Sequence, residues 1–129
     1  MTFRTVAVLT SVVTLVLGAG YLFAGTPMIG RLQIEPTESV LLFGRRMGAL
    51  YLGLSVAFFL ARSAPASVAR NALCTGTAAA CSLLAMLGIY EFLAGRAGPG
   101  MLASVLIESL LALAYVRILV RGRKIKVGD

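Results

Sequence analysis

The sequence predicts an all-α integral membrane protein, a four-helix bundle in which neighbouring helices run in opposite directions. Hydrophobic residues make up 59% of the 129 residues and charged residues only 13%. That charged fraction is about half of the roughly 25% that keeps soluble domains in water. Four apolar segments are each long enough, at roughly 20 residues, to cross a bilayer core as a helix. The connections between them are short, which favours antiparallel neighbours.

The chain is expected to form a single transmembrane domain over residues 1–129. Its four predicted spans cover residues 5–24, 40–61, 72–94 and 101–120. Glycine, proline and arginine separate the spans in segments 25–27, 62–65 and 95–100. Backbone exposed to lipid must satisfy its own hydrogen bonds, so these spans are helices. In the longest connection, Thr37 or Ser39 is expected to cap the second helix.

The first span also has features of a signal peptide. Arg4 precedes an apolar stretch, and Gly18 to Gly20 offers small residues for cleavage. The apolar stretch continues through Tyr21 to Phe23 without a polar break, which favours a retained helix.

The distribution of basic residues predicts the orientation. One side of the membrane receives eight of them, namely Arg4, Arg62, Arg70, Arg117, Arg121, Arg123, Lys124 and Lys126, and the other side receives Arg31 and Arg96. The positive-inside rule therefore places both termini in the cytoplasm. Anionic lipid headgroups account for the basic tail, so nucleic acid is not expected as a partner.

The composition excludes several site chemistries. The chain has no histidine, which rules out a Ser-His-Asp triad or a histidine zinc site within it. Cys74 and Cys81 lie seven positions apart on one helix face, about 10 Å in rise, which exceeds the reach of a disulfide. We expect neither a metal nor a cofactor.

Four charged residues fall within or at the edge of the predicted spans, and they are the informative ones: Arg45, Arg46, Glu91 and Glu108. From the helical rise, Arg46 lies about 9 Å, Glu91 about 5 Å and Glu108 about 10 Å from the outer end of its helix. All of them thus share the outer half of the membrane. Charges at this depth cost about 2.5 to 3.5 kcal/mol each and normally pair or face a polar interior.

The second span carries a stripe of small residues beside these charges. Gly44, Gly48, Tyr51 and Ser55 recur on one face, which allows close approach of another helix. Arg45 and Arg46 diverge by about 100°, so only one of them can point inward. We expect Arg46 to enter the bundle and Arg45 to reach the headgroups. Tyr21 and Tyr90 are expected in the outer aromatic belt.

The chain resembles the DoxX-like group and related families of small four-helix bacterial inner-membrane proteins. The residues that carry the likeness are Arg46-Met-Gly-Ala-Leu-Tyr51-Leu-Gly53, Ala61-Arg-Ser-Ala-Pro65, Gly88-Ile-Tyr-Glu91 and Ile107-Glu108-Ser-Leu-Leu. Some members of the DoxX-like group are implied to be accessory subunits of membrane quinone-reducing systems or of oxidative-stress complexes, while most have no assigned activity. The likeness supports Arg46 and Glu108 as a pair to test.

Two interpretations of the charges remain open. In the first, they form a buried ion pair that only fixes helix order. In the second, Arg46, Glu91, Glu108 and Tyr51 line an outer-leaflet pocket for an amphiphile such as a lipid or a quinone.

Three further function classes differ in the residues on which they depend. An accessory subunit would dock a partner helix, or a second copy of the chain, on the Gly44/Gly48 stripe. A small membrane enzyme, of isomerase or hydrolase type, would use Glu108 as its catalytic general acid/base. A proton-coupled transporter would need an oligomer.

Overall fold

The computed structural model describes residues 2–126, with side chains described for residues 2–122, and every element in that range is helical. The elements are α1 (Phe3–Phe23), α2 (Gly25–Gly30), α3 (Glu38–Ala61), α4 (Val68–Leu93) and α5 (Gly100–Lys126). Four of them, all but α2, are long and apolar enough to cross a membrane. This agrees with the predicted all-α fold and suggests a multi-pass membrane protein.

The helix boundaries follow local capping rather than hydropathy alone. Thr2 caps α1, and Thr37 caps α3 by accepting a hydrogen bond from the Val40 amide, as one of the two expected caps. Ser67 caps α4, so that helix begins four residues before the predicted span. α2 was not expected and lies in the predicted connection 25–39. The hydropathy pattern detects the apolar part of each helix, and each of these helices begins earlier, at its capping residue.

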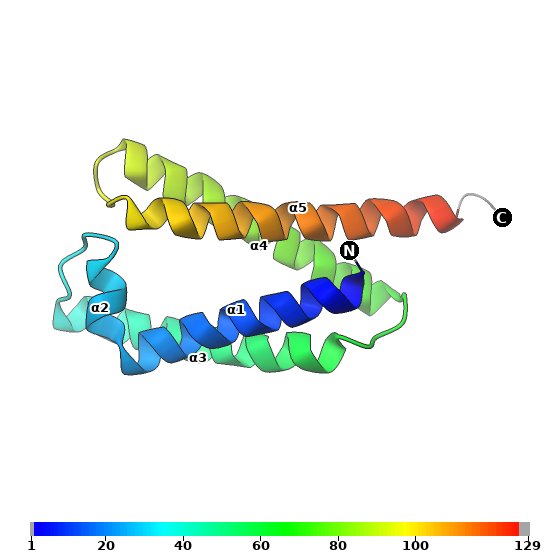
Figure 1. Ribbon diagram of the computed structural model, residues 1–129, viewed down its shortest axis with the longest axis horizontal. Helices are drawn as coiled ribbons and strands as arrows, with labels where there is room; N and C mark the ends of the chain where they lie inside the picture. Colours follow the sequence, from blue (N-terminus) through cyan, green and yellow to red (C-terminus); the bar gives the residue numbers. More distant parts are fainter. Residues whose placement is uncertain (1, 127–129) are drawn as a thin grey trace.

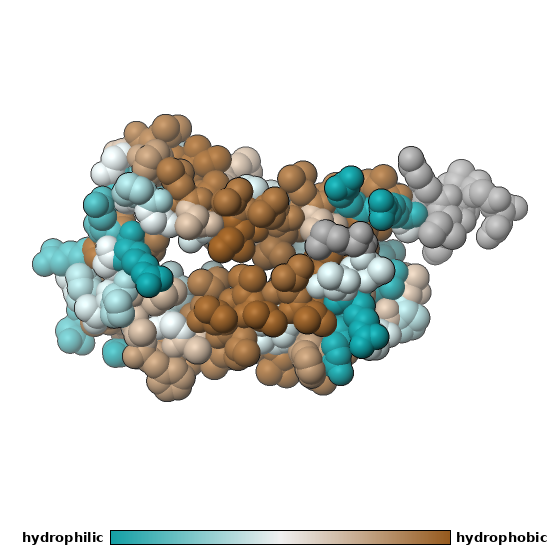
Figure 2. Space-filling view, viewed as in Figure 1, coloured by the Kyte–Doolittle hydropathy of each residue, from teal (hydrophilic) through white to brown (hydrophobic). Residues whose placement is uncertain are grey.

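The long helices form two antiparallel pairs, α1 with α3 and α4 with α5 (Figure 1). The start of α1 lies at the same end as the last turns of α5, opposite α2. Hydrophobic side chains form a belt between hydrophilic ends (Figure 2). This distribution matches helices that cross an apolar layer.

Small residues bring α1 and α3 into close contact. A Cβ atom added to Gly18 would lie 2.9 Å from the Gly48 carbonyl oxygen, and one added to Gly48 would lie 2.9 Å from the Gly18 oxygen. Two turns further along, Ser11 donates to the Ser55 carbonyl at 2.9 Å, and Ser55 donates back to the Ser11 carbonyl at 2.8 Å. Such contacts hold helices together where lipid removes the hydrophobic drive for association.

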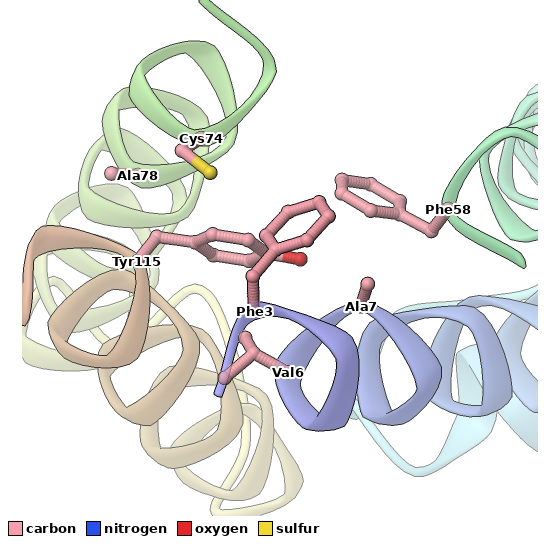
Figure 3. Packing of buried hydrophobic residues seen from close by; sticks show 7 residues of the cluster. All are labelled: Phe3, Val6, Ala7, Phe58, Cys74, Ala78 and Tyr115. Carbon is pink, nitrogen blue, oxygen red and sulfur yellow. The ribbon is translucent and has the colours of Figure 1, made fainter. Parts of the chain in front are cut away.

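At the end opposite α2, all four long helices share one core (Figure 3). Its buried members are Phe3, Val6, Ala7, Phe58, Cys74, Ala78 and Tyr115. The Tyr115 ring from α5 packs against Phe58 from α3, with 5.9 Å between ring centroids. Its hydroxyl hydrogen-bonds Thr10 of α1 at 2.8 Å. This core, the shared core below, joins the two helix pairs.

At the other end, the loops join the pairs. The Gly98 amide donates to the Leu32 carbonyl at 2.8 Å, and the Gln33 side chain fills the space where a Cβ of Gly98 would stand. Between this loop contact and the shared core, α1 and α5 contact each other only sparsely. Figure 2 shows the molecule hollowed between the two pairs in the half nearer α2.

Candidate functional site

Glu108 is half-buried on α5 and faces the other helices. Ala112 and Tyr115, one and two turns further along the same face, are both buried. The carboxylate lies near enough to Tyr21 of α1, Tyr51 of α3 and Cys81 of α4 for its charge to act on each of them. Glu108 is therefore within electrostatic range of side chains from α1, α3 and α4.

The tyrosines on the α1/α3 side form one aromatic surface. The rings of Tyr21 and Tyr51 are stacked, with 6.2 Å between their centroids and 14° between their planes. Both side chains are half-buried, and within residues 2–122 neither hydroxyl has a hydrogen-bond partner. Glu108, Tyr21 and Tyr51 thus offer polar atoms between the helix pairs, and we name this group the polar hollow.

The predicted buried ion pair is not supported. Glu91 pairs with Arg96 in the loop after α4, with Nε to Oε2 at 2.6 Å and Nη2 to Oε1 at 3.1 Å. The side chain of Arg96 is 52% exposed and that of Glu91 is 29% exposed, so the pair is only partly buried. The Glu91 hydrogen bond raises the pKa of Arg96 further above its usual value. Glu91 is therefore part of a local pair at the helix end and does not join Glu108.

A tight turn after α4 explains why Glu91 pairs with Arg96. Gly95 has a φ of 70°, which suits glycine, and it turns the chain so that the Arg96 amide reaches the Glu91 carbonyl at 3.0 Å. Closing a loop of five residues costs little entropy compared with reaching another helix. Tyr90, expected in the aromatic belt, is exposed, with its ring centroid 5.0 Å from the Arg96 guanidinium.

The expectation that Arg46 enters the bundle is wrong, because both Arg45 and Arg46 are exposed. The buried stripe of Gly44 and Gly48 faces α1. At 100° per residue, Arg46 lies about 180° from the middle of that stripe, on the far side of α3. Arg45 lies about 80° from it, at the flank. Neither arginine forms an ion pair with Glu108 within the described residues.

The Gly44/Gly48 stripe is occupied from within the chain. A Cβ on Gly44 would contact Tyr21 and Ile29, and one on Gly48 would contact Leu22 and the Gly18 carbonyl. The stripe therefore packs against α1 and is not free for a partner helix.

Two apolar spaces flank the polar hollow. A groove of about 310 Å³ runs between α1 and α5, lined by Val6, Leu9, Val13, Ile107, Leu110, Leu111 and Ala114. Three of these residues lie within three positions of Glu108. A second, open pocket, of about 220 Å³, has Tyr21 and Tyr51 in its wall and is otherwise lined by residues of α2, α3 and the loop between them. Polar atoms thus stand beside long apolar surfaces.

Tyr21 is the site residue that sequence reasoning missed. It was expected at the membrane interface, yet it stacks on Tyr51 inside the molecule. Its position three residues after Gly18, on the face of α1 that meets α3, was the available signal.

Comparisons with models of known protein families, with curated proteins and with solved structures find no match to this chain. The chemistry of the polar hollow is therefore the basis for proposing a function.

Proposed function

We propose that this chain is a small multi-pass protein of the bacterial inner membrane that binds the polar head of an amphiphile in the polar hollow. Its termini lie in the cytoplasm, as the basic residues predict. The hollow then opens in the outer half of the bilayer. The position of Glu108 carries this proposal: an ionisable group within a membrane span, half-buried, with no basic partner among the described residues. Such groups mark functional sites by default because they are costly to keep.

The donor set favours a neutral or cationic head that forms hydrogen bonds. The hydroxyls of Tyr21 and Tyr51 can donate to a carbonyl or a hydroxyl, and these hydroxyls and the Glu108 carboxylate can accept from a hydroxyl or an amine. An anionic head is disfavoured, because Glu108 is itself acidic and Arg46 points away from it. A quinone carbonyl fits this set, and the resemblance to the DoxX-like group points to the same chemistry.

The apolar groove between α1 and α5 provides a place for the tail. It begins beside Glu108 on α5 and continues toward Val6 near the shared core. An isoprenoid or acyl chain there would cover apolar side chains without displacing a polar contact. Small-molecule sites commonly combine such an apolar lining with a few convergent polar groups.

The test is native mass spectrometry of protein gently extracted from its membrane. We expect a co-purified small molecule with the wild type and its loss with Glu108→Gln, with a smaller loss for Tyr51→Phe. The matched control is Glu91→Gln, which removes the same charge from the loop-paired acid and keeps the ligand. A wild-type protein that carries only bulk lipid, with the same spectrum as Glu108→Gln, would contradict the proposal.

A further inference from the structure

A second polar site lies at the opposite end of the molecule from the polar hollow. Three arginines from three elements line one pocket of about 380 Å³: Arg4 in the first turn of α1, Arg62 at the end of α3 and Arg70 in the first turn of α4. Thr2, Phe3, Ser63 and Ala64 complete its wall. We name it the arginine pocket. It has room for a phosphate group with several water molecules, each of which takes about 30 Å³.

Two of the three guanidinium groups of the arginine pocket, those of Arg62 and Arg70, are held in place by contacts that leave most of their donors free. The Arg70 guanidinium lies 5.0 Å from the Phe3 ring centroid, and that of Arg62 lies 3.8 Å from the Phe59 ring centroid. Arg70 Nη1 donates to the Ala64 carbonyl at 3.2 Å, and Arg62 Nη1 donates to the Phe59 carbonyl. Each guanidinium carries five N–H donors, so most of them remain available.

One of these donors lacks a partner although it is buried. Arg70 Nε is the buried side-chain nitrogen or oxygen without a hydrogen bond in the part of the chain whose side chains are described. A buried donor left unpaired is destabilising, and it needs an acceptor or ordered water.

Acidic residues do not balance these charges. Glu35, Glu38, Glu91 and Glu108 lie in the half of the molecule toward α2, and Asp129 lies outside the described residues. The described ion pair, Arg96 with Glu91, is also at that end. The first turns of α1 and α4 add their positive dipole ends to the same region, while α3 ends there with its negative dipole end beside Arg62.

We propose that the arginine pocket binds a phosphate group. Guanidinium groups match phosphate oxygens in a planar, two-pronged geometry, and three of them from separate elements can surround one group. The phosphate can belong to the headgroup of an anionic phospholipid or to a free anion in solution, and the chemistry of recognition is the same. This site is separate from the polar hollow, and its test does not depend on it.

The test uses the full chain in lipid nanodiscs with two arms. In the first, inorganic phosphate is titrated into protein in pure phosphatidylcholine nanodiscs by calorimetry. In the second, the nanodiscs contain a minor fraction of phosphatidylglycerol, and native mass spectrometry measures how much of that lipid the released protein retains. Binding in the first arm identifies a free anion, and retention only in the second identifies a lipid headgroup.

Paired variants separate the pocket from general charge. Arg4→Gln together with Arg62→Gln is expected to lower binding at least about tenfold, since charge-assisted hydrogen bonds are lost. The control is Arg31→Gln with Arg45→Gln, which removes the same charge from exposed arginines outside the pocket and leaves binding unchanged. Arg4→Gln alone tests the idea without touching the Arg70 contact to Ala64. No binding in either arm, or equal loss in the control, would overturn the proposal.

Discussion

The two halves of the space between the helix pairs differ in how their polar atoms are satisfied. In the shared core, Tyr115 is buried and its hydroxyl bonds Thr10, while the nearby Ser11 and Ser55 bond each other's carbonyls. In the polar hollow, Glu108, Tyr21 and Tyr51 have no partners of this kind among the described residues. In the shared core the polar atoms are satisfied within the chain, whereas in the polar hollow they keep hydrogen-bonding capacity for the ligand that we propose.

The largest loss in the free energy of unfolding is expected from a cavity in the shared core. Phe58 is 1% exposed and packs against Tyr115. Phe58→Ala should destabilise the fold by about 3 to 5 kcal/mol, because the cavity loses packing on every side. Thermal unfolding in detergent measures it. Phe23→Ala is the control, since that ring is 87% exposed. Equal loss in both variants would show that the shared core does not join the pairs.

A smaller loss in the free energy of unfolding is expected from a substitution at the contact between α1 and α3. Gly48→Ala would place a methyl group 2.9 Å from the Gly18 carbonyl oxygen, so the helices must separate. We expect a loss of about 1 to 3 kcal/mol, typical of overpacking. At Gly53 nothing lies within 4 Å of an added Cβ, so Gly53→Ala should not destabilise. Unfolding of both variants under the same conditions decides this, and an unaffected Gly48→Ala would argue against the close approach.

The hydrogen bond between Thr10 and Tyr115 should contribute still less to the free energy of unfolding. A cycle with Thr10→Val, Tyr115→Phe and the double variant is expected to give a coupling of about 0.6 kcal/mol, near the average for such bonds in membranes. A coupling of zero would mean that the bond holds the pairs together no better than packing alone.

The smallest effect on stability is expected in the polar hollow. Glu108→Gln removes a charge that has no ion-pair partner in the described structure, so we expect the unfolding free energy to change by less than about 0.5 kcal/mol. Loss of ligand with retained stability would sharpen the contrast between the two halves. A loss of several kcal/mol would instead make Glu108 a structural residue.

The sequence was sufficient to place the long helices along the chain, but not to predict which way each side chain points around its helix. The four long helices and the cap at Thr37 were predicted correctly, because hydropathy and capping depend on short stretches of chain. The close approach at Gly48 was also expected, although its partner proved to be α1. These features need only the spacing of residues along one helix.

The partner of Glu91 and the direction of Arg46 could not be derived in the same way. Arg46 and Glu108 share a similar depth, but which face each helix turns inward depends on all its neighbours together. Glu91 found Arg96 through a turn at Gly95 that the pattern of charges does not reveal. The stacking of Tyr21 on Tyr51 depends on the same interhelical packing.

The loop contact between Leu32 and Gly98 has a consequence for how molecules arrive. It ties the helix pairs together at the end near α2, while the shared core ties them at the other. Under the proposed function, a molecule that binds in the polar hollow would therefore come sideways, out of the lipid, through the groove between α1 and α5. Partitioning into the bilayer would then be the first step of selection, and water-soluble compounds of similar head chemistry would be excluded before Glu108 meets them.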